Sequence, residues 1–343
     1  MKLKNKKILF ISASFFNYEK QIIQELQSLG ADVDFYDERP SNSLWSKGII
    51  RVSPYFLQRK IKRYYHRILK NIQGKSYDYF LLIKGESIPF FFLKALQNQY
   101  PHLKKILYLY DTVEEYPKFK KLFPYFDNIY SFEINDVRQY QLNFRPLFYI
   151  ASYATATQQQ KFKYTVASIS SAHTDRYTIS EKLNTQLEKL GFNTFFYHYI
   201  PSKSIYYFKR LFDKNCKKFD LEKLNFQKLS HTEISEIYSQ SFAVLDINKP
   251  FQLGLSLRVF EALASQKKLI TTNHQIALYP FYHPQNILIV NRNNLQITPD
   301  FFQSNFEPLS IDFEKYYSLS SWLEDVFLET HRDYWQDILK NKL

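Results

Sequence analysis

The chain has 343 residues, 45% of them hydrophobic and 23% charged, which excludes a disordered protein and suits two domains of ordinary size. Its single cysteine, Cys216, excludes an internal disulfide and a cysteine-based metal site, and we expect a cytoplasmic location. The formal net charge of +13 favours an anionic partner, which could be nucleic acid, an anionic lipid surface or a nucleotide-sugar diphosphate.

A β-α-β pattern opens the chain. Residues 7–11 (KILFI) predict a buried strand, 18–29 a helix and 32–36 a second strand. The first apolar run is short and lacks a cleavage site, so we expect no signal peptide, and no apolar run reaches the roughly 18 residues of a transmembrane helix. The loop after the first strand lacks G-x-G-x-x-G, so this Rossmann-like start carries no dinucleotide fingerprint.

Two segments interleave basic and aromatic residues with helical spacing, at 54–72 and at 203–218. Each could attach to an anionic membrane face through cations and apolar side chains. Each could equally be an ordinary helix with a solvated basic face. The second segment could also line a groove for a large substrate. The pattern alone leaves these alternatives open.

Three predicted strands each place an acidic side chain just beyond their carboxyl ends. These are Glu86 after 77–83, Asp111 after 105–110 and Glu133 after 128–132. That edge of a parallel sheet is where ligands bind. Glu86 and Asp111 are therefore candidates for a general base, and the alternative is that they cap the following helices.

The second half begins after a linker at 144–157, with a predicted strand at 164–170 and a helix to about residue 190. His173 and Arg176 lie at the start of that helix. A polar loop that opens a helix after a first strand suits phosphate binding. Arg176 is the stronger candidate, and His173 could be a helix cap or a hydrogen-bond donor to the anion.

Residues 242–273 predict a strand, a loop, a helix at 257–266 and a second strand, the right-handed crossover of a parallel sheet. Gly254 suits a tight turn that a Cβ would hinder, and Ser256 is a favourable N-cap. We expect the apolar face of the helix to comprise Leu257, Phe260, Leu263 and Ala264.

Two charged residues lie beside that apolar face. Arg258 opposes the helix dipole unless an anion sits at the N-terminus, where free N–H groups and the guanidinium could hold a pyrophosphate. Glu261, one turn on, could accept hydrogen bonds from two ribose hydroxyls. The alternative is an exposed Arg–Glu pair that stabilises only the helix.

Seven segments carry a resemblance to a known family. Residues 254–261 (GLSLRVFE) and 267–273 (KKLITTN) resemble the donor-site segment of GT-B glycosyltransferases, most closely the CgeB-like and capsule or lipopolysaccharide group. Five further segments fit that group in order: 83–86 (IKGE), 106–111 (ILYLYD), 130–133 (YSFE), 145–149 (RPLFY) and 171–176 (SAHTDR).

The resemblance implies an α/β GT-B fold with two Rossmann-like parallel-sheet domains facing across a cleft. It places an acceptor domain at 1–155, a nucleotide-sugar donor domain at 156–320, and C-terminal helices at 321–343 that pack back on the first domain. The implied activity is metal-independent transfer of a sugar from a nucleotide-diphosphate donor to a growing surface glycan, in capsule, lipopolysaccharide or exopolysaccharide synthesis. The acceptor would be a glycan or a lipid-linked glycan.

The resemblance also assigns roles to residues. Glu261 would bind the donor ribose and Arg258 the diphosphate. For such a reaction Glu86 or Asp111, candidates from their place at the sheet edge, would be the catalytic base. Further donor contacts would come from Gly254, Ser256, Arg176, His173, Asp246, Asn248 and Gln252. We expect no metal, because H-E-x-x-H and C-x-x-C motifs are missing from the sequence, and no cofactor besides the substrate.

Departures from the family pattern, among them Ser170 where a glycine is common, leave the phosphate-loop geometry and the mechanism open. Leu253 stands where many retaining enzymes have the first of two glutamates, and Gln266 replaces a usual glycine, so retention and inversion both remain open. A non-catalytic GT-B scaffold in a membrane glycan-assembly complex is one alternative. A nucleic-acid-binding protein is another, although no recognised module supports it and we expect no nucleic-acid partner. If the basic segments bind lipid, the protein would be peripheral on the inner face of the membrane.

Overall fold

The computed structural model describes residues 2–40, 54–155 and 161–341. It divides into two compact units. Unit 1 comprises Met1–Pro146 with Trp322–Gln336, and unit 2 comprises Leu147–Ser321 with Asp337–Leu343. Within the described residues, no helix combines the length and apolar character needed to cross a bilayer.

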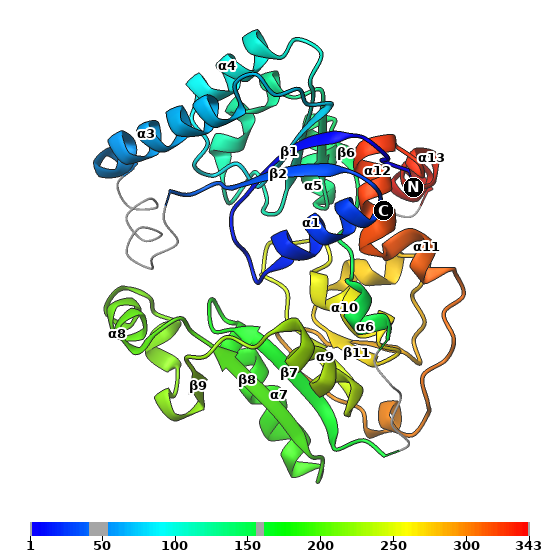
Figure 1. The fold of residues 1–343 in the computed structure, drawn as a ribbon. Helices are drawn as coiled ribbons and strands as arrows, with labels where there is room; N and C mark the ends of the chain where they lie inside the picture. Colours follow the sequence, from blue (N-terminus) through cyan, green and yellow to red (C-terminus); the bar gives the residue numbers. More distant parts are fainter. Residues whose placement is uncertain (1, 41–53, 156–160, 342–343) are drawn as a thin grey trace. The chain divides into compact units, whose positions relative to one another are not determined.

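Unit 1 is built on a six-stranded parallel sheet with the order β2-β1-β3-β4-β5-β6 (Figure 1). Its strands are β1 (Lys7–Ser12), β2 (Asp32–Asp37), β3 (Tyr79–Ile83), β4 (Lys104–Leu109), β5 (Asn128–Ser131) and β6 (Asn143–Phe144). In the central register, Phe10 lies opposite Phe35 on one side and Leu81 on the other. The central strands are apolar on both faces, as expected for a parallel sheet covered by helices.

Helices and 3-10 turns connect these strands. They are α1 (Tyr18–Ser28), α3 (Pro54–Ile72), α4 (Phe90–Gln99), η1 (Pro117–Lys121), η2 (Phe123–Tyr125) and α5 (Ile134–Tyr140). Buried side chains of α3 and α4 share one hydrophobic core with β1, β3 and β4.

The C-terminal helices α12 (Leu319–Leu328) and α13 (Arg332–Asn341) contribute to the core of unit 1 through residues 322–336. Trp322 is fully buried against Tyr108 of β4, with ring centroids 4.7 Å apart. Arg145 forms a buried ion pair with Asp325 at 2.7 Å, and Trp335 donates a hydrogen bond to the same carboxylate at 2.7 Å. A buried arginine with a carboxylate partner can keep its charge, so this contact ties the helices firmly to the sheet.

Unit 2 contains a second six-stranded parallel sheet with the order β12-β11-β10-β7-β8-β9. Its strands are β7 (Tyr164–Ser171), β8 (Thr194–Tyr199), β9 (Leu224–Asn225), β10 (Ser241–Asp246), β11 (Lys268–Thr271) and β12 (Ile287–Ile289). Counted from β7, this is the 3-2-1-4-5-6 order of a doubly wound fold, whose ligands bind where the order reverses. The reversal here lies between β7 and β10.

The connections of unit 2 are mostly helical. They are α6 (Ala151–Ala154), α7 (Arg176–Lys189), α8 (Lys203–Phe212), η3 (Cys216–Lys218), η4 (Leu221–Lys223), α9 (His231–Ser239), α10 (Leu257–Ala264), η5 (His274–Leu278), η6 (Pro299–Phe302) and α11 (Phe313–Tyr317). Buried residues of α7 pack with β7, β10 and β11 in one core cluster. The two sheets confirm the α/β class with two Rossmann-like parallel sheets.

Candidate functional site

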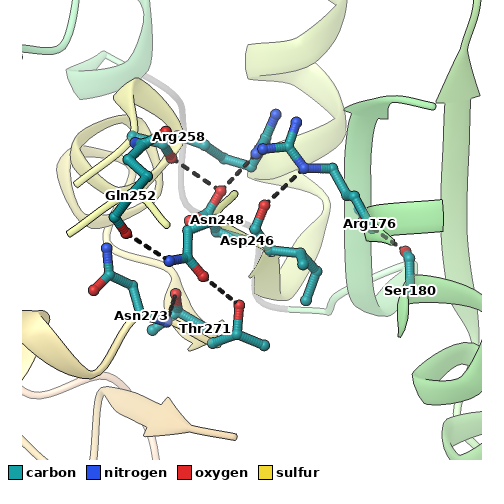
Figure 2. A network of polar contacts seen from close by, with 12 residues as sticks. Arg176, Ser180, Asp246, Asn248, Gln252, Arg258, Thr271 and Asn273 are labelled. Carbon is teal, nitrogen blue, oxygen red and sulfur yellow. Dashed lines mark hydrogen bonds and ion pairs between the residues drawn. The ribbon is translucent and has the colours of Figure 1, made fainter. Parts of the chain in front are cut away.

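The carboxyl edge of the unit 2 sheet carries a polar cluster at the point where the strand order reverses. Asp246, the last residue of β10, is fully buried at its centre. Its Oδ1 accepts a hydrogen bond from Arg258 Nη1 at 2.6 Å and another from Ser256 Oγ at 2.9 Å (Figure 2). Burial opposes the guanidinium charge, but Asp246, Tyr238 and Glu261 outweigh it and raise the pKa of Arg258. The ion pair therefore holds a charged Arg258 at the N-terminus of α10.

A second arginine approaches from the other side of this cluster. Arg176, the first residue of α7, donates from Nε to the carbonyl of Ile247 at 2.7 Å. Figure 2 shows its guanidinium and that of Arg258 pointing toward one another. Burial and repulsion from Arg258 lower the pKa of Arg176 to about 10. Positive charge is therefore crowded at this position and would be stabilised by an added anion.

His173 remains neutral beside these arginines. Burial and the charges of Arg176 and Lys249 lower its pKa to about 2. Its Nε2 lies 3.1 Å from Arg176 Nη1, which can only donate, so Nε2 accepts and the proton sits on Nδ1. The N-cap position of α7 is occupied by Asp175, so the alternative of His173 as a helix cap is wrong.

A third arginine, Arg292, completes the cluster and was missed by sequence reasoning. Its Nη1 pairs with Asp175 at 2.7 Å, and its Nη2 donates to the carbonyl of Asn248 at 2.6 Å. The usable signal was its position two residues beyond the apolar run 287–290 (ILIV), a pattern typical of a buried strand. Arg292 also contributes to the lowered pKa of Arg176, so all three guanidinium groups act on the same region.

The loop before α10 is held by its own polar side chains. Gln252 donates to the carbonyl of Gly254 at 2.9 Å, and Asn248 donates to the carbonyl of Gln252 at 2.9 Å. Asn273, after β11, donates to the carbonyl of Leu253 at 2.9 Å. Gly254 does not have a positive φ, so its backbone conformation does not require a glycine. These amides shape the loop that leads into the helix.

Helix α10 begins at Leu257, as predicted, with Ser256 at the N-cap position. The Ser256 hydroxyl, however, donates to Asp246 and makes no side-chain cap bond. The predicted N-cap position is therefore confirmed, but the hydroxyl is directed to the buried carboxylate and its oxygen accepts no bond from a helix amide. With this side chain engaged elsewhere, the N-terminus of α10 retains the character of an anion site next to Arg258.

The buried face of α10 differs from the expected stripe. Its buried residues are Val259, Phe260, Glu261, Ala262 and Leu263, while Leu257 and Ala264 are only half-buried. Glu261 is just 5% exposed, so the alternative of an exposed Arg–Glu pair is wrong.

A tyrosine accompanies Glu261 in this buried position. Burial and then Glu261, partly through a side-chain hydrogen bond, raise the pKa of Tyr153. The Tyr153 hydroxyl also lies 3.1 Å from His231 Nδ1. Glu261 thus lies within a polar network and one turn from Arg258.

Unit 1 carries a different cluster at the carboxyl edge of its sheet. Lys84, directly after β3, lies 2.9 Å from Asp111 and 3.4 Å from Glu86, measured from Nζ to a carboxylate oxygen. Arg39 also pairs with Glu86, at 2.7 Å. The two candidate bases are therefore brought together on one ammonium group. Burial opposes the charge of Lys84, but Asp111 and Glu86 raise its pKa.

The helix-capping alternative for these carboxylates is wrong. Helix α4 has Pro89 at its N-cap position, and the 3-10 helix after Asp111 has Tyr116 there. Glu133 does occupy the N-cap position of α5, but its side chain makes no cap bond. Glu86 and Asp111 instead lie in ion pairs at the edge of the sheet.

Glu38, which belongs to no sequence motif, holds the loop at residues 84–87 through hydrogen bonds. Its fully buried carboxylate accepts hydrogen bonds from the Ser87 amide, from the Gly85 amide at 3.3 Å and from Ser87 Oγ at 3.1 Å. Burial raises the pKa of Glu38. Lys84 and Gly85 both have positive φ, at 82° and 84°, so these bonds stabilise a backbone turn that side chains ordinarily disfavour.

Among the described residues, no group of three or more His, Cys, Asp or Glu side chains could hold a metal ion. The polar cluster of unit 2 offers arginines, amides and a neutral histidine. Its arginines can neutralise a bound anion, and the neutral groups can form hydrogen bonds to it.

Comparisons with known proteins add evidence on the fold. No protein-family model matches the sequence, and no curated protein matches it at a significant level. A solved glycosyltransferase from Rickettsia africae ESF-5 aligns with 98% of this chain and 99% of its own, with a TM-score of 0.54 and 14% identity. Alr3699/HepE of Anabaena, solved with UDP and glucose, aligns with 98% of this chain and 100% of its own, with a TM-score of 0.51 and 11% identity.

A solved UDP-N-acetylglucosamine 2-epimerase aligns with 96% of this chain and 96% of its own, with a TM-score of 0.51 and 9% identity. At such identities the likeness establishes architecture and leaves the reaction to be argued from the site. The chain thus has the α/β GT-B fold, with two six-stranded parallel sheets, and is glycosyltransferase-like in structure.

Proposed function

We propose that the protein is a glycosyltransferase that takes a sugar from a nucleotide-diphosphate donor bound at the polar cluster of unit 2. The observation that carries this proposal is the gathering of Arg176, Arg258 and Arg292 at the reversal of the strand order. Arg176 and Arg258 would bind the diphosphate, with Arg292 and the N-terminus of α10 adding positive potential. His173, neutral and carrying its proton on Nδ1, would donate a hydrogen bond rather than a charge.

The donor ribose would be bound by Glu261. Its carboxylate is buried one turn from Arg258, about 4.5 Å along the helix axis, so one nucleotide could reach both side chains. Tyr153 would hold the carboxylate in position. Gly254, Ser256, Asp246, Asn248 and Gln252 would shape the loop that surrounds the donor.

The acceptor hydroxyl would lose its proton to a carboxylate of unit 1. Glu86 or Asp111 would take this proton, since both lie at the edge of the sheet in ion pairs with Lys84. The reaction would require the acting carboxylate to exchange Lys84 for the acceptor hydroxyl. The resemblance to the CgeB-like and capsule group supports a surface glycan or lipid-linked glycan as the acceptor.

The comparisons suggest which nucleotide to test first. HepE was solved with UDP and glucose, and with UDP-glucose. We therefore expect UDP to raise the unfolding temperature more than GDP, CMP or dTDP. A ligand at 100 times its Kd stabilises a fold by about 2.7 kcal/mol, which a thermal-shift assay detects readily.

The test of the site uses one matched pair of variants on α7. Arg176→Gln removes a cluster guanidinium at the start of the helix, and Lys189→Gln removes an exposed charge at its end. We expect calorimetric UDP affinity to fall about 10- to 150-fold in the first variant, as for loss of a charge-assisted hydrogen bond, and to stay unchanged in the second. Equal affinity in both folded variants would overturn the donor site.

The likeness to a 2-epimerase favours one competing activity, because such an enzyme acts on the nucleotide sugar without an acceptor. Incubation with UDP-N-acetylglucosamine alone, followed by NMR, separates the two. Appearance of an epimer would favour that reaction, whereas transfer that appears only with an added glycan would favour the proposal. Nucleotide binding with neither reaction would favour a non-catalytic scaffold.

A further inference from the structure

The two basic, aromatic helices are similar in composition, but α3 buries its apolar face within unit 1 whereas α8 leaves a large apolar face of unit 2 exposed. In α3, the apolar residues Ile61, Tyr65, Ile68 and Ile72 are buried against the sheet of unit 1, and the cations between them face solvent. Over residues 58–72, α3 is therefore a packed helix with a solvated basic face.

Helix α8 presents its large apolar side chains outward instead. Tyr207 is 52% exposed, Phe208 64%, Leu211 70% and Phe212 75%. At 100° per residue these four span about 140° of the helix surface, which is one continuous face. They are four of the eleven large apolar residues that are exposed in the described part of the chain, and the other seven are scattered over both units.

The helix is held to unit 2 by its opposite side. Tyr206 is buried, donates from its hydroxyl to the carbonyl of Phe219 at 3.1 Å, and packs in a small core with Cys216. Arg210 Nη1 donates to the same Tyr206 hydroxyl at 3.2 Å. Because Tyr206 anchors one side of α8 in this small core, the opposite side with its apolar residues is directed to solvent.

Positive charges surround the exposed face. The segment 203–218 contains six cations and one acid: Lys203, Lys209, Arg210, Lys214, Lys217, Lys218 and Asp213. The single acid is engaged locally, because Asp213 Oδ1 accepts from the Asn215 amide at 2.8 Å. An apolar arc framed by cations matches the boundary between anionic headgroups and acyl chains.

We propose that α8 docks unit 2 on an anionic lipid surface. Phe208, Leu211 and Phe212 insert at the headgroup boundary, and Lys217 and Lys218 lie near lipid phosphates. A second copy of the chain fits less well, because it would bring the same six cations against this face. The proposal stands on α8 alone and does not depend on the donor site.

The test is flotation of the full chain with vesicles of phosphatidylcholine, with and without phosphatidylglycerol. We expect binding only to the anionic vesicles, and weaker binding at high salt. Phe208→Ser with Phe212→Ser should reduce the partition coefficient about tenfold or more, since each substitution removes an apolar side chain from the lipid boundary. Lys217→Gln with Lys218→Gln should reduce it roughly 25-fold at low salt, from about fivefold per basic residue.

Matched controls separate this face from general charge and apolarity. Lys60→Gln with Lys70→Gln removes two exposed cations from α3, and Leu278→Ser removes an exposed apolar side chain elsewhere in unit 2. Both should bind vesicles as the parent does. Equal losses from the α3 and α8 charge variants would show that net charge alone drives binding and would overturn the proposal.

A direct readout is the emission of Phe212→Trp compared with the parent. A blue shift on adding anionic vesicles is expected, because the new indole would enter the apolar boundary. Failure of the parent to float, or unchanged flotation of the Phe208 and Phe212 double variant, would overturn the proposal. So would loss of a dimer by light scattering in that variant, which would identify a second copy as the occupant.

Discussion

The polar clusters of the two units occupy the same place in similar sheets but have opposite charge balance. In unit 1, the carboxylates of Glu38, Glu86 and Asp111 outnumber the cations Arg39 and Lys84. In unit 2, three arginines and Lys249 surround Asp246, Asp175 and Glu261, and a histidine is kept neutral. The sheet edge supplies the location, and the side chains decide whether it suits a hydroxyl that loses a proton or an anion that needs neutralising.

The largest expected effect concerns the buried ion pair at the centre of unit 2. Arg258→Met leaves the fully buried Asp246 without its cation, so we expect the free energy of unfolding to fall by about 3–5 kcal/mol. Chemical denaturation followed by fluorescence measures this loss. The double variant with Asp246→Asn should recover part of the loss, because the stranded charge is removed as well.

An exposed pair in unit 1 is the control for that experiment. Arg332 and Glu329 lie 2.7 Å apart with the arginine side chain largely exposed, so Arg332→Met should cost less than about 1 kcal/mol. If Arg258→Met lost as little stability as Arg332→Met, the charge of Asp246 would not depend on Arg258 in the way proposed.

The next effect tests the turn that positions the unit 1 carboxylates. Gly85 has φ of 84°, and an added Cβ would lie 2.6 Å from Leu122 Cδ1. Gly85→Ala should therefore lower the free energy of unfolding by about 2–4 kcal/mol, from backbone strain and overpacking together. Gly74→Ala is the matched control, because Gly74 has φ of 79° but no atom within 4 Å of the added Cβ, so only the strain of about 1–2 kcal/mol applies. Equal losses would exclude the crowding at Leu122.

The sequence alone predicts those features of the two clusters that depend on residues close together in the chain. The strand, loop and helix of 242–264 follow from periodicity, and the helix starts at Arg176 and Arg258 suggest two places where an anion could bind. Asp246 follows only from the family resemblance. Arg292 and Glu38 could not be found in that way. Arg292 pairs with Asp175, which is 117 positions away in the sequence, and Glu38 accepts a hydrogen bond from Ser87, which is 49 positions away.

The sequence also does not predict which face of a helix is buried. The helical period of α3 and α8 defines two faces for each, but which face is buried depends on the sheet or core that receives it. The role of Ser256 is a smaller example. Its residue type and position predict the N-cap, but the direction of its hydroxyl depends on the folded position of Asp246, to which it donates.

The smallest expected effect tests the excess positive charge of unit 2 through His173. Its pKa is about 2 in the folded protein and 6.5 ordinarily, so the unfolded chain binds the extra proton below pH 6.5. Stability is unaffected above pH 6.5 and falls by about 1.4 kcal/mol for each pH unit below it. His173→Gln should remove this slope, whereas substitution of the exposed His102 by Gln should leave it. Chemical denaturation at several pH values between pH 5 and pH 7 measures this slope. A slope that survives in His173→Gln would place the excess charge elsewhere.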